Sequence, residues 1–124
     1  WFSEFMGGVR FKNYIAPLAD GTLIVEDEQH PVMKGVPASF VVPDDEWYIY
    51  DKSPRPNVHV LANVDESSYT PASDIKMGDH PVVWVNESKK ARNVYFQIGH
   101  SSKLYETEGF TTMFRNAINW TLER

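Results

Sequence analysis

Apolar residues recur at helical spacing near both ends of the chain. In the C-terminal segment they lie three or four positions apart and form one stripe of an amphipathic helix: Phe110, Met113, Phe114, Ala117, Ile118 and Leu122. At the other end, Trp1, Phe2, Phe5 and Met6 precede Gly7-Gly8 with near-helical spacing. Glycine commonly ends helices, so this segment predicts the last turns of a helix whose beginning we expect upstream of Trp1.

Between these helices the apolar residues fall into short runs that predict strands. Continuous apolar character, typical of strands covered on both faces, marks residues 58–62, 81–85 and 93–98. Residues 22–26 follow an Asp20-Gly21 turn and are rich in β-branched side chains, so they predict another strand. Residues 39–42 and 46–50 predict edge strands or parts of a long connection.

Two connecting segments have patterns of their own. Residues 30–35 fit a single helical turn, with Pro31 at its first position and Gly35 just past its end. Residues 65–80 are rich in Ser, Thr, Pro, Asp and Gly and predict a loop, whose length is typical of functional or mobile segments.

The order of these elements favours an α/β layered domain, in which the closing helix covers the sheet. A β-sandwich is the competing architecture, because only one long helix is visible. The partial helix at Trp1 favours the α/β fold, since it implies a strand and a turn just upstream.

Composition excludes several classes of protein. Twelve basic against seventeen acidic residues give a net charge of −5, and the only dense basic cluster is Lys89, Lys90 and Arg92, so we expect no nucleic-acid partner. The absence of cysteine rules out disulfides, thiolate zinc sites and a cysteine nucleophile within these residues. No apolar run approaches the ~20 residues that span a bilayer. We expect a soluble segment of a longer polypeptide, cytoplasmic or periplasmic.

Two residues are candidates for proton chemistry. His100 follows the strand that ends at Ile98, and ligands of open α/β sheets collect outside the carboxyl ends of strands. A histidine there can act as a general acid, a base or a metal ligand; a turn histidine bonded to backbone is the alternative. Glu46, in an acidic run of three, could orient a histidine, bind a metal or accept hydrogen bonds from sugar hydroxyls, or it could belong to a solvated turn.

Other residues could contact a ligand. The aromatic side chains Trp47, Tyr48, Tyr50 and Trp84 can stack on a sugar ring, although aromatic residues in strands usually build the core. His30 opens a turn before Pro31, whereas His59 and His80 are expected to be structural. A metal-dependent hydrolase is a further hypothesis, in which folding would bring His30, Glu46 and His100 together.

Six segments, in this order, resemble the trehalose-utilisation (ThuA-like) family. They are Trp1 through Gly8 with Phe11, His30-Pro31-Val32 with Gly35, Asp45 through Tyr48, Pro81 through Trp84, Arg92 through His100, and Asn116 through Trp120. The match covers nearly the whole chain. Because that family belongs to the class I glutamine amidotransferase-like superfamily, the resemblance implies a flavodoxin-like parallel sheet, with residues 1–124 forming only the C-terminal half of a single ThuA-like domain.

The resemblance also implies a site. His100 lies where the amidotransferases have the histidine partner of a cysteine nucleophile, but ThuA-like proteins generally lack that cysteine, so glutamine hydrolysis is not implied. The candidate catalytic residues are His100 and Glu46. The candidate substrate-binding residues are Trp47, Tyr48, Trp84, Ser101 and His30.

The family context implies the utilisation of trehalose or a related disaccharide, through keto-sugar intermediates handled with an oxidoreductase partner. Neither a cofactor nor a metal is identified by these residues. A non-catalytic carbohydrate-binding or assembly module with the same fold is the alternative function. Half of a sheet would expose an apolar edge and face, so we also expect a homodimer.

Overall fold

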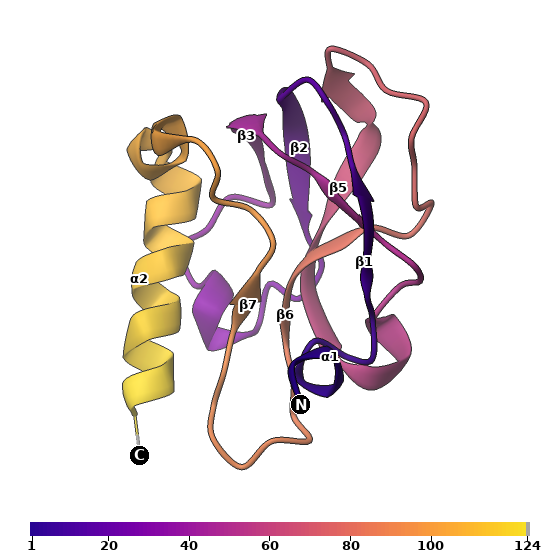
Figure 1. The fold of residues 1–124 in the computed structure, drawn as a ribbon. Helices are drawn as coiled ribbons and strands as arrows, with labels where there is room; N and C mark the ends of the chain where they lie inside the picture. Colours follow the sequence, from indigo (N-terminus) through magenta and orange to yellow (C-terminus); the bar gives the residue numbers. More distant parts are fainter. Residues whose placement is uncertain (124) are drawn as a thin grey trace.

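The computed structural model describes residues 1–123 and contains two antiparallel sheets with helices packed around them (Figure 1). The larger sheet has the order β3 (Ser39–Asp45), β2 (Ala19–Val25), β5 (His59–Thr70), β6 (Pro81–Val85) and β7 (Tyr95–Phe96). The smaller sheet pairs β1 (Phe11–Tyr14) with β4 (Tyr48–Tyr50). The helical elements are α1 (Phe2–Phe5), α2 (Glu108–Leu122) and the 3₁₀ turns η1 (Pro31–Met33), η2 (Arg55–Asn57) and η3 (Ser102–Glu106).

The domain is α/β, but the expectation of a flavodoxin-like parallel sheet is wrong for these residues. Every strand pair is antiparallel. The physical reason lies in the connections, because a parallel pair needs a crossover of a dozen or more residues that usually carries a helix. The long helix α2 follows the last strand instead of linking two neighbours. The apolar runs predicted strands correctly and could not give their direction.

The predicted loop over residues 65–80 is only partly a loop, because β5 continues to Thr70. In this half of the strand Glu66 and Tyr69 are buried, while Asp65, Ser67 and Thr70 are exposed. The polar composition of residues 65–70 therefore predicted a loop where the structure has a strand with one side facing solvent. Glu66 also accepts hydrogen bonds from the backbone N–H groups of Met77 and Gly78, at 2.7 Å each, which fastens the following loop to the strand.

The other predicted elements are present with shifted boundaries. The helix end at Gly7-Gly8, the turn after His30 and the C-terminal helix are confirmed, and β6 has the predicted bounds. The strands β4 and β7 are shorter than predicted, and β1, which is exposed at all four positions, was not predicted. The stripe of α2 is only half buried: Phe110, Met113 and Ala117 enter the core, whereas Ile118 and Leu122 are exposed.

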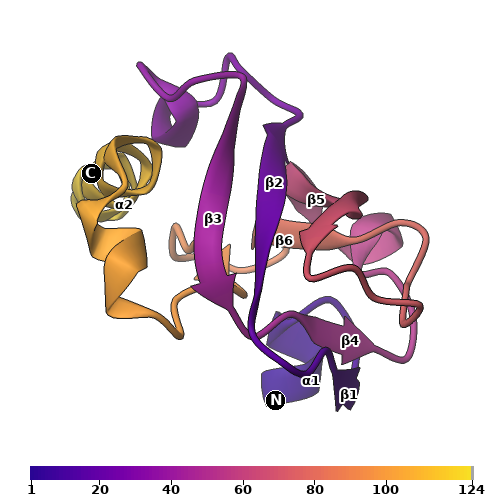
Figure 2. The same cartoon turned by 90° about the horizontal axis from the view of Figure 1, so that it is seen from above.

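Two apolar clusters hold these elements in place. The main core contains the inner side chains of β2, β5 and β6 together with those of α2 and η1. A smaller cluster of Met6, Val9, Tyr50 and Trp84 fills the space between α1, β4 and β6. Figure 2 shows α1, β1 and β4 gathered together away from α2, with the chain running from the end of β3 into β4.

Several large apolar side chains are exposed near the N-terminus, including Trp1, Phe2 and Phe11. The expected homodimer stays a prediction. Across residues 1–123, no helix has the length and apolar character that crossing a membrane requires.

Candidate functional site

The site is built where β3 ends and the chain turns toward β4. Asp44 has a positive φ of 46°, a conformation that Asp adopts more readily than most residues. Its backbone N–H donates to Asp20 at 2.9 Å, and its carboxylate pairs with Lys103. This turn directs the next side chain, Asp45, into the protein, where it is 0% exposed.

The buried Asp45 carboxylate is hydrogen-bonded on both oxygens. Oδ2 accepts from the backbone N–H of Gly99 at 2.9 Å, and Oδ1 accepts from that of Glu46 at 2.8 Å. Oδ1 also lies 2.8 Å from Nδ1 of His100 and 3.4 Å from the His100 backbone nitrogen. Gly99 has a φ of 138°, which favours glycine and brings its N–H to the carboxylate. The carboxylate thus fixes the segment that carries His100.

The two ring nitrogens of His100 have different surroundings. Nδ1 faces Asp45, while Nε2 lies 2.9 Å from the hydroxyl of Tyr48 and 3.5 Å from Oε2 of Glu46. The His100 side chain is 28% exposed and that of Glu46 is 29% exposed. Nδ1 is therefore held by a buried carboxylate, whereas Nε2 lies beside the Tyr48 hydroxyl and the partly exposed Glu46.

Folding brings together His100 and Glu46, as the sequence predicts, but with a different division of roles. Glu46 was a candidate to orient the histidine, and its neighbour Asp45 occupies that position instead. The sequence predicted that a carboxylate of the acidic run would meet the histidine, but not which of the three. The choice depends on the turn at Asp44, which sends Asp45 inward and leaves Glu46 partly exposed.

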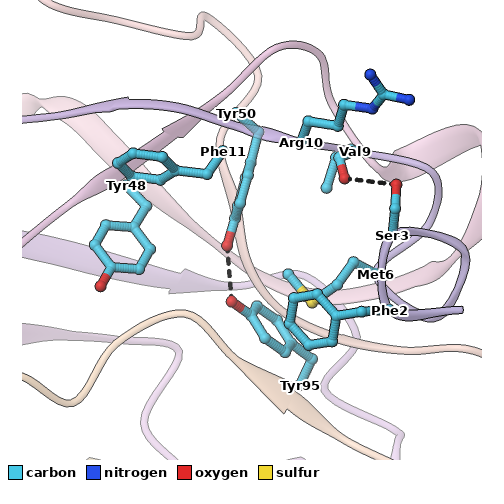
Figure 3. A pocket seen from close by; sticks show the side chains of 9 residues that line it. All are labelled: Phe2, Ser3, Met6, Val9, Arg10, Phe11, Tyr48, Tyr50 and Tyr95. Carbon is cyan, nitrogen blue, oxygen red and sulfur yellow. Dashed lines mark hydrogen bonds between the residues drawn. The ribbon is translucent and has the colours of Figure 1, made fainter.

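Tyr48 connects this site to an apolar cleft. Its ring packs edge-on against Phe11 and against the imidazole of His100, with centroid separations of 5.2 and 4.9 Å. The cleft has a volume of about 520 Å³ and is lined by Phe2, Ser3, Met6, residues 9–11, Tyr48, Tyr50 and Tyr95 (Figure 3). His100 and Glu46 do not line it. In Figure 3 the Tyr48 hydroxyl points away from the middle of the cleft, so the ring separates the two regions.

The cleft floor carries a pair of hydrogen-bonded phenols. The hydroxyls of Tyr50 and Tyr95 lie 2.7 Å apart (Figure 3). Burial raises the pKa of both phenols, and the hydrogen bond with Tyr95 raises that of Tyr50 further. They remain neutral near neutral pH and offer hydrogen-bonding groups, without charge, to whatever occupies the cleft.

A second histidine, His80, contacts the same tyrosine from the interior. Its Nε2 donates to the backbone carbonyl of Tyr48 at 3.0 Å, and its Nδ1 lies 3.0 Å from Glu66 and 3.2 Å from the hydroxyl of Tyr69. Burial alone would raise the pKa of Glu66, but hydrogen bonds from His80 and from two backbone N–H groups outweigh it, and the pKa lies below its usual value. The His80 side chain is 0% exposed, which confirms that it is structural.

Two of the predicted sugar-stacking residues are buried, which corrects the expectation for them. Trp47 is 0% exposed, packs against Tyr69 and donates from its indole nitrogen to the carbonyl of Ala19 at 2.8 Å. Trp84 is 1% exposed and packs against Tyr50 and Tyr95 beneath the cleft. Neither ring presents a face to solvent, because both fill clusters that a strand-rich domain needs for its core.

Ser101 and His30 have local structural roles. The Ser101 hydroxyl accepts from the backbone N–H of Lys103 and caps η3. His30 caps η1 through its Nδ1, and its ring lies 4.8 Å from that of Trp120 and 5.7 Å from that of His59. Burial and the nearby His59 lower the pKa of His30. Their part in substrate binding stays a prediction.

The hypothesis that His30, Glu46 and His100 converge on a metal ion does not fit this fold. His30 packs against α2 and His59, whereas the other two residues meet at the end of β3. Within residues 1–123, no cluster of three or more His, Asp and Glu side chains has a geometry that could hold a metal ion.

Comparisons with known proteins agree on one family. The family model described as trehalose utilisation (ThuA) matches residues 1–121. A solved ThuA-like protein from Bacteroides uniformis ATCC 8492 is 32% identical, with a TM-score of 0.87 over 100% of this chain and 51% of that one. A ThuA-like protein from Parabacteroides merdae ATCC 43184 is 22% identical, with a TM-score of 0.61 over 91% and 40% of the two chains, and shows likeness of fold alone.

The chain thus spans about half the length of the Bacteroides uniformis protein. No curated protein matches it.

Proposed function

The chain belongs to the trehalose-utilisation (ThuA) family, and on that premise we propose that it acts on a disaccharide such as trehalose, or on a keto-sugar derived from one. His100 exchanges a proton with the sugar, and Glu46 accepts hydrogen bonds from its hydroxyls. Both residues lie at a surface that the sugar can reach, 3.5 Å apart at their nearest polar atoms.

One observation carries this proposal: the imidazole of His100 is held by a buried carboxylate on one nitrogen, and its side chain is 28% exposed. A general base needs a fixed orientation and a nitrogen within reach of the proton that it removes. The proton comes from a hydroxyl, or from a carbon beside a carbonyl group, where the electron pair left behind is stabilised as an enolate.

The keto-sugar reaction requires a second protein, which forms the ketone. A ketone arises from a sugar hydroxyl by loss of two electrons and two protons, and an oxidoreductase partner with its own electron acceptor supplies that step. In this proposal the present chain handles only the proton transfers that follow oxidation. Family membership and the pairing of His100 with Asp45 support it.

Deuterium exchange tests the proposal directly. A keto derivative of trehalose is incubated with the protein in D₂O, and NMR follows the loss of the C–H signals beside the carbonyl. We expect the wild type to accelerate this exchange, and His100→Gln to slow it by about 10²–10⁴-fold, the usual contribution of a general base. His59→Gln is the matched control, because His59 is a surface histidine paired with Asp27 and Glu87. Equal rates for His100→Gln and wild type would overturn the catalytic assignment.

A non-catalytic carbohydrate-binding module is the second candidate, favoured by the aromatic cleft that His100 and Glu46 do not line. On this alternative the cleft binds a sugar without converting it. NMR titration with trehalose distinguishes the two: shifts at Phe11, Tyr48 and Tyr95 without any deuterium exchange in the wild type would support the binding module.

A further inference from the structure

The hydrogen bonds around His100 determine which of its nitrogens carries the proton. The Asp45 carboxylate already accepts backbone N–H groups on both oxygens, so it faces Nδ1 as an acceptor, and Nδ1 must be the donor. In the neutral ring, Nε2 is then left with its lone pair. A lone pair needs a donor, and the groups near Nε2 are the hydroxyl of Tyr48 and the carboxylate of Glu46.

Of these two groups, only the tyrosine can serve the neutral ring. The Tyr48 hydroxyl carries a proton and lies within hydrogen-bond distance, at 2.9 Å. An ionised Glu46 has no proton to give, and its nearest oxygen lies at 3.5 Å, the limit of a hydrogen bond. Glu46 can therefore accept a hydrogen bond from Nε2 only after the ring has gained its second proton.

We propose that Tyr48 is the direct proton partner of His100, and that Asp45 is the positioning residue that keeps the Nε2 lone pair aimed at the Tyr48 hydroxyl. The role of the pair in catalysis rests on the proposed function, whereas the direction of its hydrogen bonds does not. Tyr48 thereby changes from a sugar-stacking candidate to a member of a relay that runs from Asp45 through His100 to the surface.

Two protons move when the relay acts on a substrate. The O–H bond of Tyr48 breaks as Nε2 of His100 gains the proton, and the phenol oxygen at the same time takes the proton of the substrate. The substrate keeps the electron pair. The ring becomes an imidazolium between the Asp45 carboxylate and Glu46, and the reverse transfers restore the starting state. No oxidant or reductant is needed.

The tautomer can be measured without any substrate. Long-range ¹H–¹⁵N NMR of uniformly labelled protein distinguishes a protonated ring nitrogen from one with a lone pair. Since a charge-assisted hydrogen bond favours one tautomer strongly, we expect Nδ1–H to exceed Nε2–H at His100 by about tenfold or more. A dominant Nε2–H tautomer in the wild type would overturn the proposal, whether or not any variant folds.

Two neighbouring carboxylates form a matched pair for this measurement. In Asp45→Asn the amide can present a donor to Nδ1, so we expect the excess of Nδ1–H to fall by about tenfold. In Glu46→Gln we expect Nδ1–H to stay in excess, because this change removes an acceptor beside Nε2 and leaves Asp45 in place. If both variants keep the wild-type ratio, Asp45 is not the positioning residue.

Chemical modification tests the role of Tyr48. Diethyl pyrocarbonate acylates an imidazole nitrogen through its lone pair, and peptide mass spectrometry gives the rate at each histidine. In Tyr48→Phe the Nε2 lone pair loses its hydroxyl donor, so we expect His100 to react several-fold faster than in the wild type. Tyr105→Phe is the control, because Tyr105 is exposed on η3 and packs against Phe110 and Phe114. An unchanged rate in Tyr48→Phe would overturn the hydrogen bond.

The two proposals fail differently. If the wild type shows no proton exchange with a keto-sugar, the proposed function fails while the tautomer and acylation results still stand. If His100→Gln abolishes exchange and Tyr48→Phe retains the wild-type rate, His100 keeps its role and the relay through Tyr48 is overturned. Loss of exchange in both variants, with folding preserved, supports the complete relay.

Discussion

The protein contains two sets of a carboxylate, an imidazole and a tyrosine hydroxyl, and they differ chiefly in their access to solvent. At the end of β3, His100 lies between Asp45 and Tyr48 and is 28% exposed. In the interior, His80 contacts Glu66 and Tyr69 and is 0% exposed. Both imidazoles also meet at Tyr48, since His80 bonds its backbone carbonyl and His100 its hydroxyl.

The difference shows that the same residue types can lie either fully in the interior or at a partly exposed position. Both ring nitrogens of His80 face protein groups in a space that no ligand enters, so its hydrogen bonds contribute to stability and fix the backbone of Tyr48. The Nε2 of His100 lies beside Glu46, on a side chain that is 28% exposed. We therefore expect the interior set to govern folding and the surface set to govern chemistry.

The largest effect that would test this division is on stability. His80→Ala leaves the buried Glu66 without its side-chain partner and opens a cavity, so we expect a loss of about 3–5 kcal/mol in the free energy of unfolding. His100→Ala leaves Asp45 with its backbone N–H donors, so we expect a loss of about 1 kcal/mol. Urea denaturation measures both. Equal losses in the two variants would contradict this division between folding and chemistry.

Acid should lower the stability that the interior set contributes to the fold. The pKa of Glu66 is lower in the folded protein than in the unfolded chain, so the unfolded chain binds more protons as the pH falls. The contribution of Glu66 to stability is thus fully present above the unfolded value of about 4.3 and is lost as the pH falls toward the folded value. We expect urea midpoints to drop below about pH 4.3, and to drop less in Glu66→Gln. Parallel curves for the two proteins would contradict this assignment.

The smallest effect comes from the two hydroxyls. Tyr69→Phe removes a buried hydroxyl that contacts His80, and we expect a cost of about 1 kcal/mol. Tyr48→Phe removes a hydroxyl at the surface, and we expect a change within about 0.5 kcal/mol. Thermal and urea unfolding measure both variants, and their stabilities can be compared directly because each substitution deletes one oxygen. A larger loss in Tyr48→Phe would show that the surface set also stabilises the fold.

Much of the local structure could be predicted from the sequence, because it depends on neighbours along the chain. The stripe from Phe110 to Leu122 and the apolar residues 81–85 gave α2 and β6. The polar second half of β5 could not be found in this way, since its buried positions, Glu66 and Tyr69, are themselves polar. Strand direction was also inaccessible, because a strand has the same alternation in either direction.

For the candidate site, the sequence identified the residue types: a histidine after a strand, three adjacent carboxylates and an aromatic run. It could not decide that Asp45 rather than Glu46 holds His100, or that Trp47 is buried while Tyr48 reaches the surface. Those outcomes depend on the turn at Asp44 and on contacts between residues more than fifty positions apart. Local pattern sets which chemistry is present, whereas tertiary packing decides which atoms meet and which of them a ligand can reach.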